Sequence, residues 1–265
     1  MKIAAWSKFV RRACVAAGFF LFGASALAGP INLVKNGGFE LNRGTGQLGV
    51  NTSMDHWTST WGGFNFVFEE GAADTTGAKT WWTTDPLASV LHLWGANNGG
   101  ANALASSQDG GSFVAVDGAY TPFGLKPIEQ MISGLVVGQK YVLSFEWAAA
   151  QQHRFHGVTS EKWSVTLGDS KYETATYTNA SHASSSWMQE AFIFTATKSE
   201  ALLSFLAAGT PAGHPPFSLL DGVSLTTLEP EQQTGLVPEP STVLILLVGG
   251  AAMLLARRRR QARPQ

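Results

Sequence analysis

Apolar and polar positions alternate with a period of two through the central part of the chain. The clearest run has an apolar side and a more polar side: Tyr141, Leu143, Phe145 and Trp147 against Val142, Ser144 and Glu146. Trp163, Val165 and Leu167 repeat this period, and further strands are predicted over residues 187–197, 201–208 and 217–225. Gly, Asn, Asp and Pro clusters separate these runs, so residues 29–228 are predicted to form one all-β domain, a β-sandwich.

The N-terminal segment has the pattern of a secretory signal peptide. A basic region with Lys2, Lys8, Arg11 and Arg12 precedes an apolar run over residues 13–27. Small residues before Gly29 predict cleavage by signal peptidase between Ala28 and Gly29, which makes residues 1–28 the signal peptide. Cys14 is the only cysteine, so the mature chain is expected to stand outside the cytoplasm without disulfides.

The C-terminal segment predicts one transmembrane helix. A polar linker over residues 229–237 leads to Pro238-Glu239-Pro240, and the apolar run 241–256 follows. At about 1.5 Å per residue this run is roughly 24 Å long, slightly shorter than the bilayer core of about 30 Å. The cluster Arg257, Arg258, Arg259 and Arg260 is expected on the cytoplasmic side, which leaves the body of the chain outside the membrane.

The proline turn, the apolar helix and the arginine block, in this order over residues 238–263, resemble the PEP-CTERM sorting signal of Gram-negative bacteria. The resemblance implies that an exosortase recognises Pro238, Glu239 and Pro240, removes the helix, and releases or transfers the body. It also implies an inner-membrane precursor and a final place at the cell surface, in the outer envelope or in the extracellular matrix. An ordinary C-terminal tail anchor after a proline linker is the alternative.

The charge of the body differs from that of the whole chain. Residues 29–230 hold nine basic and seventeen acidic residues, a net charge of −8, whereas the complete chain has −1. An acidic surface repels phosphate backbones, so nucleic-acid binding is not expected. Calcium and neutral glycans are compatible with this charge.

Short motifs across the body resemble the galactose-binding-like jelly rolls, a group that includes many carbohydrate-binding modules. They are Asn36-Gly37-Gly38-Phe39-Glu40, residues 112–118 with 128–130, residues 134–145, and Leu220-Asp221-Gly222-Val223-Ser224-Leu225. The resemblance implies a jelly-roll β-sandwich. The family often shows two consecutive acids before the final Val-Ser-Leu, where this chain has Asp221-Gly222, and this departure weakens any inference about a metal.

Asp221 suggests a structural calcium site. In a regular strand over residues 217–225 its carboxylate would lie among core side chains, and an unpaired buried charge is costly. Calcium would remove this cost, and the resemblance implies Glu40 as a second ligand. The alternative is a β-bulge at Asp221-Gly222 that turns the carboxylate toward solvent or a backbone amide.

Aromatic residues give the only indication of a ligand. Trp81 and Trp82 are adjacent and would point to opposite sides of an extended segment, so one of them is expected to be exposed and able to stack on a sugar ring. Phe64, Phe66 and Phe68 alternate as core residues do, and most tryptophans of such a sandwich are expected to pack in its core.

Other candidate chemistry is limited. His153 and His156 lie in a predicted loop and are expected to be surface residues, while the Glu69-Glu70 pair, Glu129, Glu146 and Glu161 are the acids from which a glycosidase pair would be drawn. No nucleophile elbow, phosphate loop or zinc-protease motif is present. The sequence therefore predicts an exported, non-catalytic protein of the cell envelope or extracellular matrix, structural or glycan-binding, and exopolysaccharide is an expected partner. The alternative is a secreted carbohydrate-active enzyme.

Overall fold

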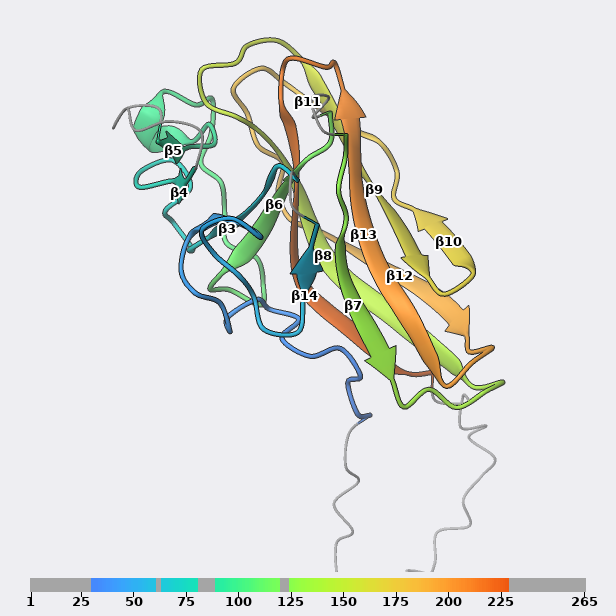
Figure 1. Cartoon of the computed structure of the whole chain (residues 1–265). Helices are drawn as coiled ribbons and strands as arrows, with labels where there is room; N and C mark the ends of the chain where they lie inside the picture. The colour runs from blue at the N-terminus through green and yellow to red at the C-terminus, as the bar shows by residue number, and fades with distance from the viewer. Residues whose placement is uncertain (1–29, 61–62, 81–88, 120–123, 229–265) are drawn as a thin grey trace, which may run out of the picture. The chain divides into compact units, whose positions relative to one another are not determined.

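The computed structural model describes residues 30–60, 63–80, 89–119 and 124–228. Two antiparallel sheets form a jelly-roll β-sandwich (Figure 1). The first sheet has the order β1 (Gly46–Gln47), β3 (Asn65–Phe68), β6 (Phe113–Asp117), β14 (Pro216–Thr227), β8 (Lys140–Gln151) and β12 (Met188–Thr195). The second has the order β10 (Ser170–Glu173), β9 (Thr159–Leu167), β13 (Glu200–Thr210), β7 (Ile128–Ser133) and β2 (Thr58–Ser59), and β11 (Tyr177–Asn179) also pairs with β9.

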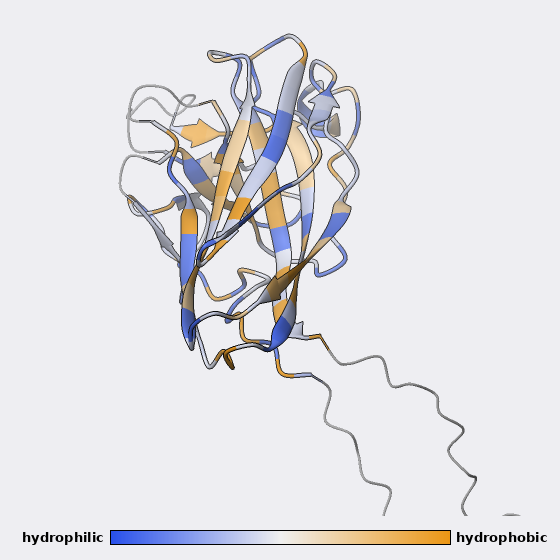
Figure 2. Ribbon diagram, turned by 90° about the vertical axis from the view of Figure 1, so that its right-hand side faces the viewer, coloured by the Kyte–Doolittle hydropathy of each residue, from blue (hydrophilic) through white to orange (hydrophobic). Residues whose placement is uncertain are grey.

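The predicted alternation along the strands is confirmed. The apolar side chains of β8 and those of β9 meet between the two sheets, where Trp147, Trp163 and Phe205 are almost fully buried. Hydrophobic and hydrophilic bands follow one another along strands of the sandwich in the hydropathy view (Figure 2). Because each strand buries one face against the other sheet, the period of two defines a single core between them.

A second apolar cluster lies on the outer face of the first sheet. Phe66, Ala115 and Leu219 point away from the main core and pack against residues of the segment 69–112, among them Ala73, Leu91 and Leu93. This segment contains the small pair β4 (Ala78–Lys79) and β5 (Val90–Leu91) and the 3-10 helix η1 (Ala96–Asn98), which lie beside β3 and β6 (Figure 1). The first sheet is therefore covered on both faces over part of its width.

The expectation of a regular strand at Asp221 is wrong, and the predicted alternative, a bulge, is present. The pairing of β14 with β8 shifts between Asp221 and Ser224, and Gly222 has a φ of +57°. Leu219 before the bulge faces the outer cluster, whereas Val223 after it faces the main core. An extra residue reverses the parity of a strand, so Asp221 lies on the outer face of the sheet.

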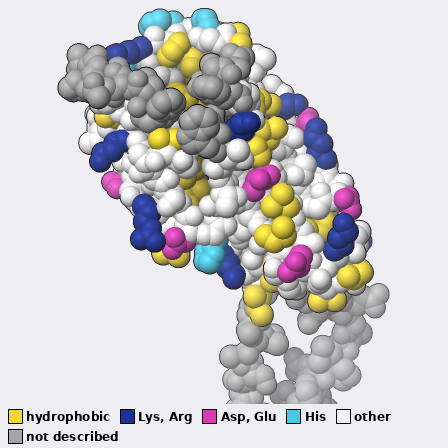
Figure 3. Space-filling view, viewed as in Figure 1, with side chains coloured by type: hydrophobic (Ala, Val, Ile, Leu, Met, Phe, Trp, Pro, Cys, Tyr) yellow, Lys and Arg dark blue, Asp and Glu magenta, His cyan; other side chains and the backbone are white. Residues whose placement is uncertain are grey.

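Several predictions fall outside the described residues. These are the cleavage pair Ala28-Gly29, the indole pair Trp81-Trp82, and the whole of residues 229–265 with the linker, the predicted helix and the sorting motif. The described residues contain no helix that is both long and apolar enough to cross a membrane. On the face seen in Figure 3, the acidic and basic side chains of the described residues are interspersed.

Candidate functional site

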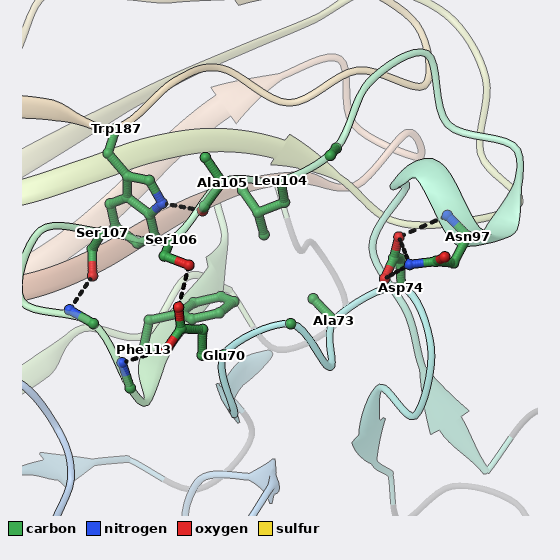
Figure 4. A pocket seen from close by; sticks show the side chains of 14 residues that line it. Glu70, Ala73, Asp74, Asn97, Leu104, Ala105, Ser106, Ser107, Phe113 and Trp187 are labelled. Carbon is green, nitrogen blue, oxygen red and sulfur yellow. Dashed lines mark hydrogen bonds between the residues drawn. The ribbon is translucent and has the colours of Figure 1, made fainter.

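A cavity of about 100 Å³ lies where the segment 69–112 meets the start of β12. Residues from three stretches line it, and the polar and aromatic ones are Glu70, Asp74, Asn97, Ser106, Phe113 and Trp187. Trp187, Leu104 and Ala105 lie on one side of the cavity, and Glu70 and Ser106 point toward each other across it (Figure 4). The cavity thus combines an indole with carboxylate, amide and hydroxyl groups.

Trp187 forms part of the cavity wall and is hydrogen-bonded to the loop that contains Ala105. The indole nitrogen donates a 2.6 Å hydrogen bond to the carbonyl oxygen of Ala105, and the ring meets Phe113 edge to face at 5.8 Å. The side chain is half-buried, so part of the indole stays open to the cavity. Sequence reasoning missed this residue because it stands at the start of a predicted strand, with no pattern to separate it from core tryptophans.

The two carboxylates of the cavity are held by protein donors. Ser106 donates its hydroxyl to Glu70, and the amide nitrogen of Gly111 donates to the other oxygen of Glu70 at 3.2 Å. These hydrogen bonds, that of Ser106 first, lower the pKa of Glu70 below its usual value. Asp74 accepts from the backbone nitrogen of Asn97 at 2.9 Å and from the amide of its side chain at 3.2 Å. Both carboxylates therefore have defined positions.

Asp221 and Glu40, the predicted calcium ligands, both contact the loop 107–112 next to this cavity. Asp221 is fully buried, accepts the hydroxyl of Ser107, and accepts the backbone nitrogen of Gly222 at 2.8 Å. Glu40 is exposed and accepts the backbone nitrogen of Ser112 at 2.6 Å. Each carboxylate thus already has donors from the protein.

The surroundings of Asp221 are acidic. Burial raises its pKa to about 7, and the nearby carboxylates of Asp109 and Glu146 add to the rise. A divalent cation would relieve this repulsion, so the donor set has the right chemistry. Within residues 30–228, as far as they are described, no three His, Cys, Asp or Glu side chains are arranged to hold a metal ion, so backbone oxygens would have to complete the shell.

The other acids considered from the sequence are not brought together. Glu129 lies on β7 in the second sheet, and Glu146 on β8 accepts the backbone nitrogen of Gln108 at 2.6 Å. Glu161 lies fully buried on β9, where it accepts the hydroxyl of Thr159. Glu69 is exposed beside Glu70 and does not line the cavity.

His153 and His156 lie in a loop, as the sequence indicated. Sequence reasoning missed that His92, His182 and His214 lie close to them, because these three come from distant loops that only the fold brings together. No signal of local spacing connects these five residues.

No protein-family model matches the chain, and no curated protein matches it. Among solved structures, the chain is similar to the CBM22-1 xylan-binding domain of Xyn10C from Paenibacillus barcinonensis, with 10% identity over 76% of this chain and 97% of that one, at a TM-score of 0.35. It is also similar to TmCBM61, solved in complex with β-1,4-galactotriose, with 15% identity over 74% and 99% of the two chains and a TM-score of 0.33.

The enzymatically active domain of tailspike protein 4 of bacteriophage CBA120 is a further match, with 13% identity over 75% of this chain and a TM-score of 0.36. The match covers only 22% of that solved chain. At these TM-scores the similarities add nothing on ligand or activity, and the fold rests on the strand pairing described above.

Proposed function

We propose that the β-sandwich binds a glycan in the cavity beside Trp187 and does not cleave it. The observation that carries this proposal is the half-exposed indole next to two positioned carboxylates and the amide of Asn97. The C–H faces of a sugar ring are apolar and pack on an indole, while its hydroxyls need hydrogen-bond partners at the edges. The cavity offers both kinds of contact within a small space.

The charge of the cavity favours a neutral sugar over an acidic one. Its lining residues include Glu70 and Asp74 and no Lys or Arg. The lowered pKa keeps Glu70 ionised at neutral pH, and a uronic acid placed here would be repelled by like charge. Sugar hydroxyls can instead donate to the free lone pairs of these carboxylates.

The ionisation of the acids supports a binding role without catalysis. A glycosidase needs a carboxylic acid with a raised pKa beside a second carboxylate at the scissile bond. In the described part of the chain, Asp117, Glu161 and Asp221 have raised pKa values, and none of them lines the cavity. Glu70 has its pKa shifted the opposite way, which suits an acceptor and not a proton donor.

The route of the protein forms part of the proposal. A signal peptide cleaved between Ala28 and Gly29 and a PEP-CTERM signal around Glu239 would carry the body to the cell surface or extracellular matrix. The basic region before an apolar run at the N-terminus and the arginine block after an apolar run at the C-terminus support this route. Mass spectrometry of the extracellular form should find Gly29 at one end and a terminus near Pro240 at the other.

Polysaccharide retention tests the binding site. The purified chain should be retained by at least one neutral polysaccharide and not by uronic-acid polymers, and incubation should release no reducing ends. Trp187→Ala should weaken retention about tenfold, equivalent to about 1.4 kcal/mol, while Trp187→Phe keeps part of the ring contact. Tyr172→Ala on β10, which removes a ring stacked on Phe192 outside the cavity, is the matched control.

The result that would overturn this proposal is equal retention of the Trp187→Ala and Tyr172→Ala variants, since the cavity would then play no part. Turnover of a polysaccharide that is lost in Glu70→Gln would instead establish an enzyme. No retention on any polysaccharide would leave a structural protein of the envelope.

A further inference from the structure

Five of the six histidines of the chain gather at one end of the sandwich, beside a hollow that shares Asp74 with the cavity described above. They come from four separate stretches of the chain, and histidine side chains are visible at the upper end of the molecule in Figure 3. His92 and His153 lie 6.2 Å apart between ring centres, and His156 and His182 lie 4.8 Å apart. His214 contacts the carbonyl oxygen of His156 through its Nδ1.

His156 and His182 face each other with ring nitrogens. Nδ1 of His156 lies 2.6 Å from Nε2 of His182, so one of these nitrogens donates an N–H to the other, and the tautomers decide which. Such a contact requires at least one neutral imidazole, because two imidazolium rings would both point an N–H at the same space. His156 is exposed and His182 is half-buried, so the pair is open to solvent.

The backbone and Trp94 hold this pair in place. The indole of Trp94 lies against the ring of His182, with centres 4.1 Å apart and planes at 30°, and it donates its N–H to the carbonyl oxygen of Phe155 at 2.8 Å. The backbone nitrogen of His182 donates to the side chain of Gln151 at 3.1 Å. Trp94 is almost fully buried. A buried ring therefore anchors both histidine loops.

We propose that His156 and His182 bind a divalent transition-metal ion, Cu²⁺ in preference to Zn²⁺, through Nδ1 and Nε2. Two imidazole nitrogens about 2.0–2.1 Å from one metal ion lie about 3 Å apart, so a ring rotation that opens the contact by about half an ångström makes room for the ion. On binding, the proton between the two facing nitrogens moves to the other nitrogen of the ring that carries it. Both rings stay neutral, so metal binding releases no net proton. Imidazole ligands and the general order of affinities favour copper.

The rest of the coordination shell is open. Among the residues that the structure describes, no third His, Cys, Asp or Glu side chain completes a site, so water or an external ligand must fill the remaining positions. His92, His153, Arg154 and Asp74 line the neighbouring hollow, where the positive charge of Arg154 faces the negative charge of Asp74. Metal binding should weaken in acid, because protons compete with the metal ion for the imidazole nitrogens.

Copper titration of the purified chain tests this proposal. Binding of one Cu²⁺ should quench tryptophan fluorescence, because Trp94 lies against His182, and calorimetry should give one site per chain. His182→Asn should weaken binding about tenfold or more, and so should His156→Gln. Asn is used at position 182 because that residue has a φ of +64°, which Asn tolerates.

His56→Asn is the matched control, since His56 also has a positive φ, of +71°, and lies outside the cluster. It should bind copper as the wild type does, and circular dichroism should show all variants folded. Equal weakening in His56→Asn, or unchanged binding in His182→Asn, would overturn the proposal and indicate adventitious binding. Electron paramagnetic resonance adds an independent readout, because two nitrogen ligands should fall to one in either cluster variant.

Discussion

Replacing Glu161 by Gln should stabilise the protein at neutral pH. Glu161 lies on the inner face of β9 in the row with Trp163 and Val165, where its side chain is fully buried. Thr159 donates to one carboxyl oxygen, and the other oxygen has no hydrogen-bond partner within the described part of the chain. Burial raises the pKa of Glu161 from 4.5 to about 8, so the folded protein holds this group protonated at pH 7.

The direction and size of the effect follow from proton linkage. In the unfolded chain the carboxyl ionises at its ordinary pKa of 4.5, whereas the folded chain keeps the proton up to about pH 8. The contribution of Glu161 to the free energy of unfolding is therefore fully present below about pH 4.5 and is lost as the pH rises toward 8. Each pH unit in this window costs about 1.4 kcal/mol, so at pH 7 the ionisable side chain costs about 3 kcal/mol.

Glutamine reproduces the shape of the protonated acid and cannot ionise. Glu161→Gln should raise the free energy of unfolding by about 3 kcal/mol at pH 7, a rise of roughly 6–12 °C in Tm for a domain of this size, and change little near pH 4. Urea unfolding followed by tryptophan fluorescence from about pH 4 to about pH 9 measures both. Burial also raises the pKa values of Asp117 and Asp221 to about 7, so a smaller pH slope should remain in the variant.

Glu173→Gln is the control with the opposite sign. Glu173 is exposed on β10, and hydrogen bonds from Lys162 and then Lys171 lower its pKa to about 2. The contribution of Glu173 to the free energy of unfolding is present above pH 4.5 and is lost in acid. Glu173→Gln should therefore gain no stability at pH 8. If Glu161→Gln keeps the full pH slope of the wild type, or unfolds more easily at pH 8, Glu161 is ionised in the folded protein and the reasoning is refuted.

Three further predictions concern the bulge, the proposed calcium and the sorting signal. Gly222→Ala should lower the free energy of unfolding by about 1 kcal/mol, because alanine is strained at a φ of +57°, and Gly222→Asn should lower it less in the same urea titration. Chelation with EDTA should lower the Tm of the wild type more than that of Asp221→Asn; an identical Tm with and without chelator would exclude the calcium proposal. Glu239→Ala should leave the protein unprocessed in the membrane fraction on immunoblots, and normal surface processing of that variant would contradict the exosortase proposal.

The strands could be predicted from the sequence because their signal is local. The alternate apolar residues from Tyr141 to Trp147 and from Trp163 to Leu167 all lie in the main core. Their spacing alone therefore shows which face of each strand is buried. The sequence allowed both a regular strand and a bulge at Gly222 and could not choose between them. One extra residue moves every side chain after it to the opposite face of the sheet. Only the pairing partner β8 shows which of the two registers is adopted.

The candidate sites depend on contacts between distant parts of the chain. Trp187 reaches Ala105 across more than eighty positions in the sequence, and His182 reaches His156 across twenty-six. Neither pair has a spacing that a helix or strand would impose, so no periodicity signals them. Glu161 shows a related limit: it stands two residues before Trp163 on the same face of β9, but the sequence alone considered it only as a candidate catalytic acid.

The layer formed by residues 69–80 and 89–112 limits how a polymer can approach the molecule. This layer packs directly on Phe66, Ala115 and Leu219, which occupy the outside of the first sheet. Where this layer covers the first sheet, a long saccharide chain cannot lie directly across the strands. The cavity is also well below the roughly 300 Å³ of pockets that enclose larger ligands. Recognition here would select the end or a side branch of a saccharide chain. The number of such saccharide ends, and not the length of the polysaccharide, would then set how much protein the polysaccharide retains.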